Sequence, residues 1–141
     1  MSSATVSSFE RTIHKTNVWL KDIMEELGWD SHQRAYHAQR AVLHTLRDRL
    51  STEEVADLAA QLPMLVRGFY YDGWAPSHRT LSERHKEQFL AHIDEASRDD
   101  MTVTAEEVAR AVFRVISKHV SSGEIADIKS TLPQGIRDLW A

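Results

Sequence analysis

The chain has 141 residues, of which 42% are hydrophobic and 27% are charged, and these values are typical of a globular protein with one core. Its formal net charge of -4 gives no basic excess, so we expect neither a nucleic acid nor a membrane surface as its partner. The chain contains no Cys, which excludes disulfides, thiol nucleophiles and thiolate metal ligands. The small, polar segment Met1–Ser8 does not resemble a signal peptide, and we expect one cytoplasmic domain over 1–141.

Apolar residues in the first half recur at three- and four-residue steps, which predicts helices rather than strands. Gly28 is suited to end the first helix, and the Ser51–Glu54 stretch has the pattern of a capping box that begins the third. Pro63 breaks the third helix and can begin a short fourth one. The predicted helices cover 9–27, 31–50, 51–62 and 63–70.

The pattern restarts after the aromatic segment 70–78. Three more capping boxes are predicted, at Thr80–Glu83, Thr104–Glu107 and Ser121–Glu124. Each precedes residues with helical spacing, and Pro133 breaks the last of these helices as Pro63 does in the first half. No stretch alternates apolar and polar residues convincingly, so strand content should be near zero.

The two halves of the sequence are copies of each other, set 70 positions apart. Between 34–70 and 104–140, eleven of 37 positions are identical without a gap, whereas unrelated segments share about one residue in fifteen to twenty. The chain therefore contains internal repeats over 9–70 and 79–140, joined by the aromatic linker 70–78. Because each repeat alone leaves an apolar face uncovered, we predict an all-α, compact bundle of about eight helices in which two pseudo-two-fold related repeats bury those faces together.

The chain resembles a bacterial family known only as domain of unknown function 2267. The likeness is carried by Ala41–Leu50, Ala59–Pro63 and Arg67–Trp74 in the first half, and by Phe89–Leu90, Ala111–Phe113, Gly123–Glu124 and Leu132–Pro133 in the second. The resemblance covers nearly the whole chain. It implies an all-helical bundle of two repeats, and no activity or catalytic residue comes with it.

The eight His do not predict a metal site, because ligands on one helix need a spacing of three or four. Pairs such as His37 and His44 lie seven apart, which is about 10.5 Å along a helix axis. His37, Arg40, His44 and Arg47 instead form a cationic stripe opposite the apolar face of the second helix. This stripe suits an acidic partner or a phosphate group, and a plain solvated face is the competing interpretation.

Charged residues are also repeated in both halves. Glu54, Asp57 and Arg67 recur as Glu124, Asp127 and Arg137. Helix capping and ion pairs explain this repetition, although a symmetric binding surface would repeat as well.

The aromatic linker is the one stretch that resembles a recognition site. It contains Tyr70, Tyr71, Asp72 and Trp74, with Arg67 one turn before it, and aromatic rings with Arg are typical of binding hot spots. In the competing interpretation, Trp74 folds back to close the seam between the repeats.

No phosphate loop, nucleophile elbow or zinc-protease motif occurs in the chain. We therefore assign no catalytic residue, metal or cofactor, and we expect a non-enzymatic helical module whose partner is another protein or a second copy of itself. The candidate binding residues are Arg67, Tyr70, Tyr71, Asp72, Trp74, His37, Arg40 and His44. The alternative function is the binding of a small molecule or cofactor, with or without catalysis, in a cavity between the repeats.

Overall fold

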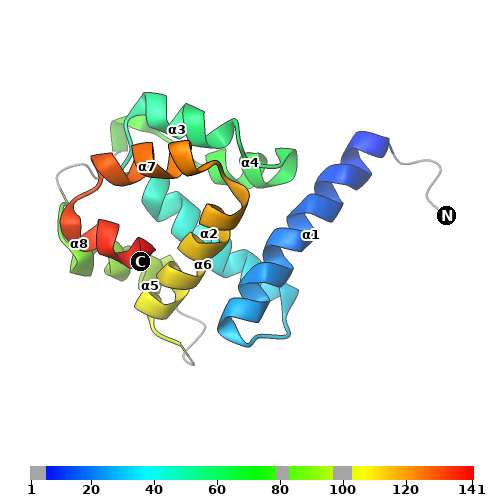
Figure 1. Ribbon diagram of the computed structural model, residues 1–141, viewed down its shortest axis with the longest axis horizontal. Coiled ribbons are helices and arrows are strands. Elements are labelled where there is room, and N and C mark those ends of the chain that lie inside the picture. The colour runs from blue at the N-terminus through cyan, green and yellow to red at the C-terminus, as the bar shows by residue number, and fades with distance from the viewer. Residues whose placement is uncertain (1–5, 79–82, 97–102) are drawn as a thin grey trace.

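The computed structural model describes residues 6–78, 83–96 and 103–141 (Figure 1). The first half forms α1 (Ser7–Leu27), α2 (His32–Arg47), α3 (Thr52–Ala59), α4 (Met64–Tyr71) and the 3-10 turn η1 (Pro76–His78). The second half forms α5 (Lys86–Ala96), α6 (Ala105–His119), α7 (Ser122–Thr131), α8 (Gln134–Arg137) and the 3-10 turn η2 (Asp138–Trp140). The described ranges contain eight α-helices and no strand, which confirms the predicted all-α class.

Local sequence signals explain several helix ends. Gly28 adopts a left-handed conformation with φ 68° and its N–H donates to the Met24 carbonyl, as a C-cap glycine does. The Ser31 hydroxyl accepts a hydrogen bond from the N–H of Arg34 at the start of α2. Thr104 and Glu107 form the complete capping box expected at the start of α6.

Some predicted boundaries and caps are wrong. α2 ends at Arg47 and α3 at Ala59, because tighter three-residue hydrogen bonds replace the helical pattern over the next few residues. α5 begins only at Lys86, and Thr80–Ser82 of its predicted capping box lie outside the described residues. Ser51 and Ser121 do cap α3 and α7. However, no hydrogen bond returns from Glu54 or Glu124 to complete either box.

Helices α2 and α6 form the centre of the bundle. They contact each other, and α1 and α5 each pack against both of them. The core includes apolar side chains from both halves. Within it, the ring of Phe113 stacks on that of Trp140 with centroids 4.0 Å apart. In Figure 1, α3 and α7 lie side by side across one end of this bundle, and the two helices are in contact.

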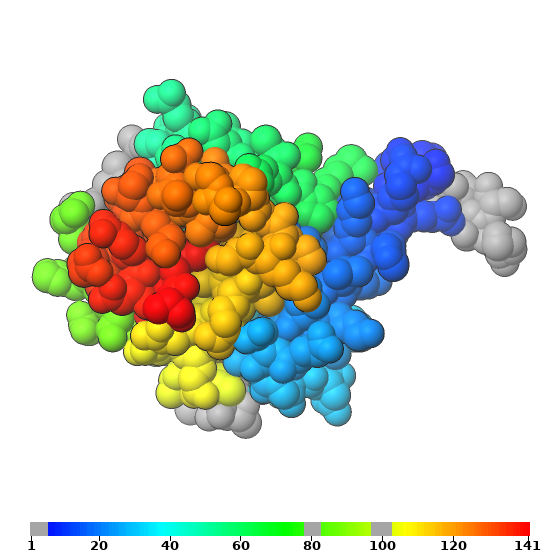
Figure 2. Space-filling view, viewed as in Figure 1, coloured from blue at the N-terminus to red at the C-terminus, as the bar shows by residue number. Residues whose placement is uncertain are grey.

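The N-terminal half of α1 projects beyond the bundle (Figures 1 and 2). The C-terminal half of the same helix is buried through Trp19, Leu20 and Ile23. The large exposed apolar side chains of the described residues all belong to the start of the chain, to α1 or to the first turn of α4: Val6, Phe9, Ile13, Val18, Met64 and Leu65.

Candidate functional site

The cationic stripe of α2 and the aromatic linker, predicted as separate candidates, meet in one cluster. Arg40 forms an ion pair with Asp72, with 2.9 Å between Nη2 and Oδ2. The Nε2 atom of His44 lies 2.6 Å from the Phe69 carbonyl oxygen. Arg47 donates from Nη1 to the carbonyl oxygens of Tyr70 and Asp72, at 2.7 and 3.0 Å. These side chains satisfy carbonyls that the end of α4 would otherwise leave unpaired.

His44 is half-buried at this joint. Because a carbonyl only accepts hydrogen bonds, Nε2 must carry the proton that His44 donates to Phe69. Burial lowers the pKa of His44 below its ordinary value, and the nearby charges of Arg47 and Arg40 lower it further. A neutral ring with a proton on Nε2 is therefore the form that fits this site.

The aromatic rings of the linker pack against one another. Tyr70 is fully buried and its hydroxyl donates to the Val55 carbonyl at 2.9 Å, and burial raises the pKa of this hydroxyl. The ring of Tyr71 lies 5.3 Å from that of Tyr70 and 5.5 Å from that of Trp74. Trp74 is half-buried, and its Nε1 atom is buried without a hydrogen-bond partner among the described residues.

The cluster brings together six of the eight predicted binding residues: Arg40, His44, Tyr70, Tyr71, Asp72 and Trp74. His37 lies on the exposed side of α2, where its Nε2 atom is 3.1 Å from Gln33 Nε2. Arg67 lies apart from the cluster and donates to the carbonyl oxygens of Ala59 and Leu62. Most polar atoms of the cluster thus serve to hold α4 on α2, and a binding role for these residues stays a prediction.

A groove whose residues the sequence did not single out lies between α1 and the joint of α3 with α4. Its volume is about 540 Å³. Residues from α1, the α3–α4 joint and α6 line it: His14, Lys15, Val18, Trp19, Ala60, Gln61, Leu62, Pro63 and His119. None of His37, Arg40, His44 or Tyr70 contributes to this groove.

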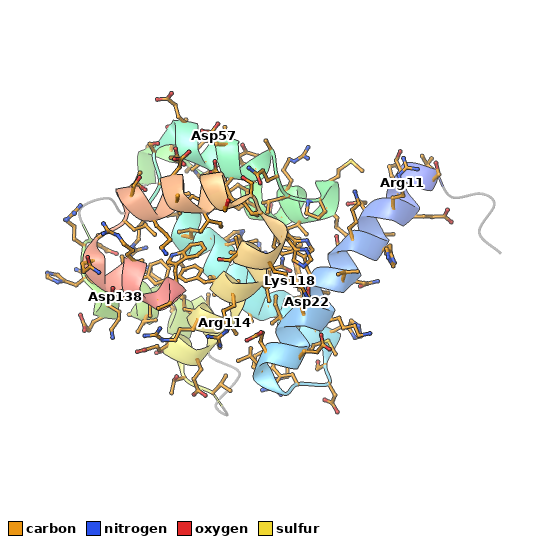
Figure 3. All side chains as sticks on the ribbon, in the orientation of Figure 1. Arg11, Asp22, Asp57, Arg114, Lys118 and Asp138 are labelled. Carbon is orange, nitrogen blue, oxygen red and sulfur yellow. The ribbon has the colours of Figure 1, made fainter. Side chains whose placement is uncertain are left out.

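Asp22 and His119 form a polar pair beside the groove. The Nε2 atom of His119 lies 2.7 Å from Asp22 Oδ2, and the His119 ring stacks on Trp19 with centroids 4.7 Å apart. Lys118 adds a second ion pair to Asp22 at 3.2 Å (Figure 3). Burial by itself raises the pKa of Asp22, but the hydrogen bonds and charges of His119 and Lys118 outweigh it, so the pKa is lowered. The pair joins α1 to α6 and orients His119 toward the groove.

Asp22 and His119 are 97 positions apart, and neither has a partner at helical spacing that would have drawn attention to it. Only the packing of α1 on α6 brings them together. The described residues also contain one group whose oxygen atoms are close enough to share a metal ion, formed by Glu54, Asp57 and Glu124.

These features define a small all-helical domain with a groove of apolar and polar residues and an exposed apolar helix half. The chain belongs to the family described as "Uncharacterized conserved protein (DUF2267)", which matches residues 16–139. This match confirms the resemblance that the sequence motifs indicated. A search of the curated proteins finds no match to the chain. Within the described ranges, no helix combines the length and apolarity that a bilayer-spanning segment requires.

Proposed function

We propose that this protein is a self-association module, in which the exposed N-terminal half of α1 pairs with the same surface of a second copy. The observation that carries this proposal is the apolar stripe of α1, which is buried along only half of its length. The proposal keeps the predicted protein-binding role and moves its surface from the aromatic linker to α1.

The stripe follows alternating three- and four-residue steps along one face of α1. Its members are Val6, Phe9, Ile13, Thr16, Leu20 and Ile23. Thr16, Leu20 and Ile23 are buried against the bundle. Phe9 and Ile13, however, are 53% and 48% exposed. This spacing is typical of a helix that packs against another helix along its whole length. The apolar face of the first half of α1 is not covered by any of the described residues.

The start of α4 widens the apolar surface. Met64 and Leu65 are exposed there, and the Leu65 N–H donates to the Thr12 hydroxyl at 2.8 Å, which holds this turn against α1. Exposed apolar side chains gathered in one place mark interaction surfaces, whereas single ones scattered over a surface are ordinary. Burial of one such side chain contributes about 1.5–3 kcal/mol when it is complete.

A second copy is the partner that fits this surface best. A two-fold pair presents each apolar stripe with an identical one, so the surface needs no complement elsewhere. Glu10 and Arg11 beside the stripe carry opposite charges, and that turn therefore carries no strong excess of one sign to repel a copy of itself. Because the projecting half of the 21-residue α1 is only about three turns long, the interface is smaller than the roughly 800 Å² per partner of a standard complex. We therefore expect a reversible dimer with a dissociation constant on the order of micromolar.

The test is sedimentation velocity of the full chain over a concentration range from about 1 to several hundred micromolar. We expect a monomer–dimer equilibrium for the wild type and at least tenfold weaker association for the double variant Phe9→Ala, Ile13→Ala. Circular dichroism should show that this variant keeps its helices, because both side chains are about half exposed.

Val18→Ala is the matched control. Val18 is also an exposed apolar residue of α1, but it lies off the stripe, so its loss should leave association unchanged. A wild type that remains monomeric at every concentration contradicts the proposal. Association that is weakened equally by Val18→Ala and by the double variant also contradicts it.

The groove supports a second candidate function, the binding of a small molecule between the two repeats. It combines an apolar wall with His14, Lys15 and His119, and residues of both repeats line it. Such a mixture of apolar lining and few polar groups is typical of ligand sites. A screen of small anionic compounds by ligand-observed NMR tests this function. Hits that His119→Ala abolishes would support it, and hits that are indifferent to His119 would not.

A further inference from the structure

Four carboxylates from two different helices gather where α3 and α7 lie side by side. Glu54 and Asp57 belong to α3, and Glu124 and Asp127 belong to α7. They are equivalent positions of the two repeats, 70 residues apart. Figure 3 labels Asp57 at this end of the molecule, and the two helices are in contact.

The spacing of their oxygen atoms suits one bound ion. One carboxylate oxygen from each of Glu54, Asp57 and Glu124 lies within 4.8 Å of the other two. Three oxygens at most 4.8 Å apart all lie within about 2.8 Å of a point between them, so a shift of a few tenths of an ångström brings them to the metal–oxygen distances of about 2.3–2.6 Å that calcium takes.

A second observation concerns how deeply Glu124 is buried. The residue is only 8% exposed, and its Oε2 atom is buried and accepts no hydrogen bond from the described residues. Glu54 Oε2 is likewise buried and accepts no hydrogen bond from the described residues. No Lys, Arg or His of the described ranges forms an ion pair with any of the four carboxylates. A buried carboxylate without a counter-charge is strongly unfavourable. Its positive partner is either a proton shared in the Glu54–Glu124 hydrogen bond or a bound cation, and above the pKa of Glu124 only the cation remains.

Helix capping does not account for the arrangement. Ser51 and Ser121 accept the hydrogen bonds from the N–H groups of Glu54 and Glu124, and neither Glu side chain returns to complete a capping box. An acidic residue in a first helical turn interacts favourably with the helix dipole while it remains in water. Here, by contrast, burial and the charges of Glu54, Asp57 and Asp127 raise the pKa of Glu124 to about 7.

We propose that Glu54, Asp57 and Glu124 bind a divalent cation of the calcium, manganese or magnesium class, with Asp127 beside the site. The donors are all carboxylate oxygens, which suit hard cations and not the nitrogen and sulfur preferences of zinc. The ion joins α3 of the first repeat to α7 of the second and neutralises the repulsion between them. The site is independent of the proposed α1 interface, which lies elsewhere on the molecule.

The test uses the full chain, freed of metal with a chelator, at about pH 8 so that the carboxylates are ionised. Calorimetric titration and thermal unfolding are measured with Ca²⁺, Mn²⁺ and Mg²⁺ at up to about 5 mM. We expect one ion per chain and a rise in Tm for at least one of the three. Glu124→Gln should weaken binding at least tenfold, whereas Glu53→Gln, which removes an exposed charge from the same turn of α3, should have little effect.

Measurements on Glu124→Gln with and without metal distinguish the loss of the ion from misfolding. Without metal, Glu124→Gln should unfold at a higher temperature than the wild type, because one buried like charge is gone. With metal, it should lack the rise in Tm that the wild type shows, and a misfolded variant could not produce this pair of results. The proposal is overturned if none of the three cations changes the Tm of the wild type, or if Glu124→Gln responds to them as the wild type does.

Discussion

Arg67 and Arg137 make two matching hydrogen bonds in the two halves of the molecule. The Nε atom of each donates to the carbonyl oxygen eight residues earlier, Ala59 for Arg67 and Lys129 for Arg137, at 3.0 Å in both cases. The Nη2 atom of each donates to the carbonyl five residues earlier, at 3.1 and 2.9 Å. Each guanidinium thus caps the helix before it, α3 or α7, and this supports the prediction of two equivalent repeats.

Arg67→Met and Arg137→Met should each destabilise the protein by about 2 kcal/mol, because each removes two charge-assisted hydrogen bonds to helix-terminal carbonyls. Urea unfolding followed by circular dichroism measures the loss. Arg84→Met, at an exposed position, is the control and should cost little. Equal losses at Arg84 and at the two capping arginines would show that these hydrogen bonds do not matter.

The contribution of His44 to the stability of the protein should decrease in mild acid. Its pKa in the folded state lies below the ordinary 6.5, so protons bind the unfolded chain more readily than the folded one. The contribution of His44 is therefore complete above about pH 6.5 and is lost as the pH falls below it.

His44→Gln keeps an N–H donor for the Phe69 carbonyl and does not titrate, so it should lose less stability than the wild type between about pH 7.5 and 5.5. Urea unfolding at several pH values measures the difference. The exposed His14 gives the control His14→Gln, which should follow the wild type. Identical profiles of stability against pH for His44→Gln and the wild type would show that the titration of His44 does not affect stability.

Arg49 depends on Glu83 for its counter-charge. The arginine is 5% exposed, its Nη2 atom lies 2.9 Å from Glu83 Oε1, and its guanidinium lies over the Phe89 ring. Glu83→Gln leaves a buried guanidinium without its ion pair and should cost about 2–3 kcal/mol. Glu87→Gln, an exposed charge change on α5, should cost far less. Thermal or urea unfolding measures the loss of stability in the two variants. Equal losses would contradict the dependence of Arg49 on Glu83.

Two glycines should respond in opposite directions to Ala. Gly28 has φ 68° and ends α1, so Gly28→Ala should destabilise the protein by about 1 kcal/mol through backbone strain alone. Gly68 lies inside α4 with room for a methyl group, so Gly68→Ala should stabilise the protein by about 0.5–1 kcal/mol. Differential scanning calorimetry compares the two variants. Shifts of Tm in the same direction would contradict this reading of the two backbones.

Sequence spacing predicted the helical class well because it depends on local preferences. The apolar steps located α1, α2, α6 and α7, and Thr104 and Gly28 marked helix ends through bonds made within a few residues. The same reasoning misjudged Glu54 and Glu124. It assigned them to capping boxes, whereas each turns toward a residue of the other half.

For the candidate sites, the sequence alone determined which residue types exist and which of them share a helix face. It thus brought His37, Arg40 and His44 onto one stripe, and the apolar residues of α1 onto another. Only the tertiary structure decided what each face meets. The packing of α1 on α6 created the Asp22–His119 pair, the contact of α3 with α7 gathered the carboxylates, and the bundle left Phe9 and Ile13 uncovered. Such contacts join residues far apart in the chain, and periodicity within a helix carries no information about them.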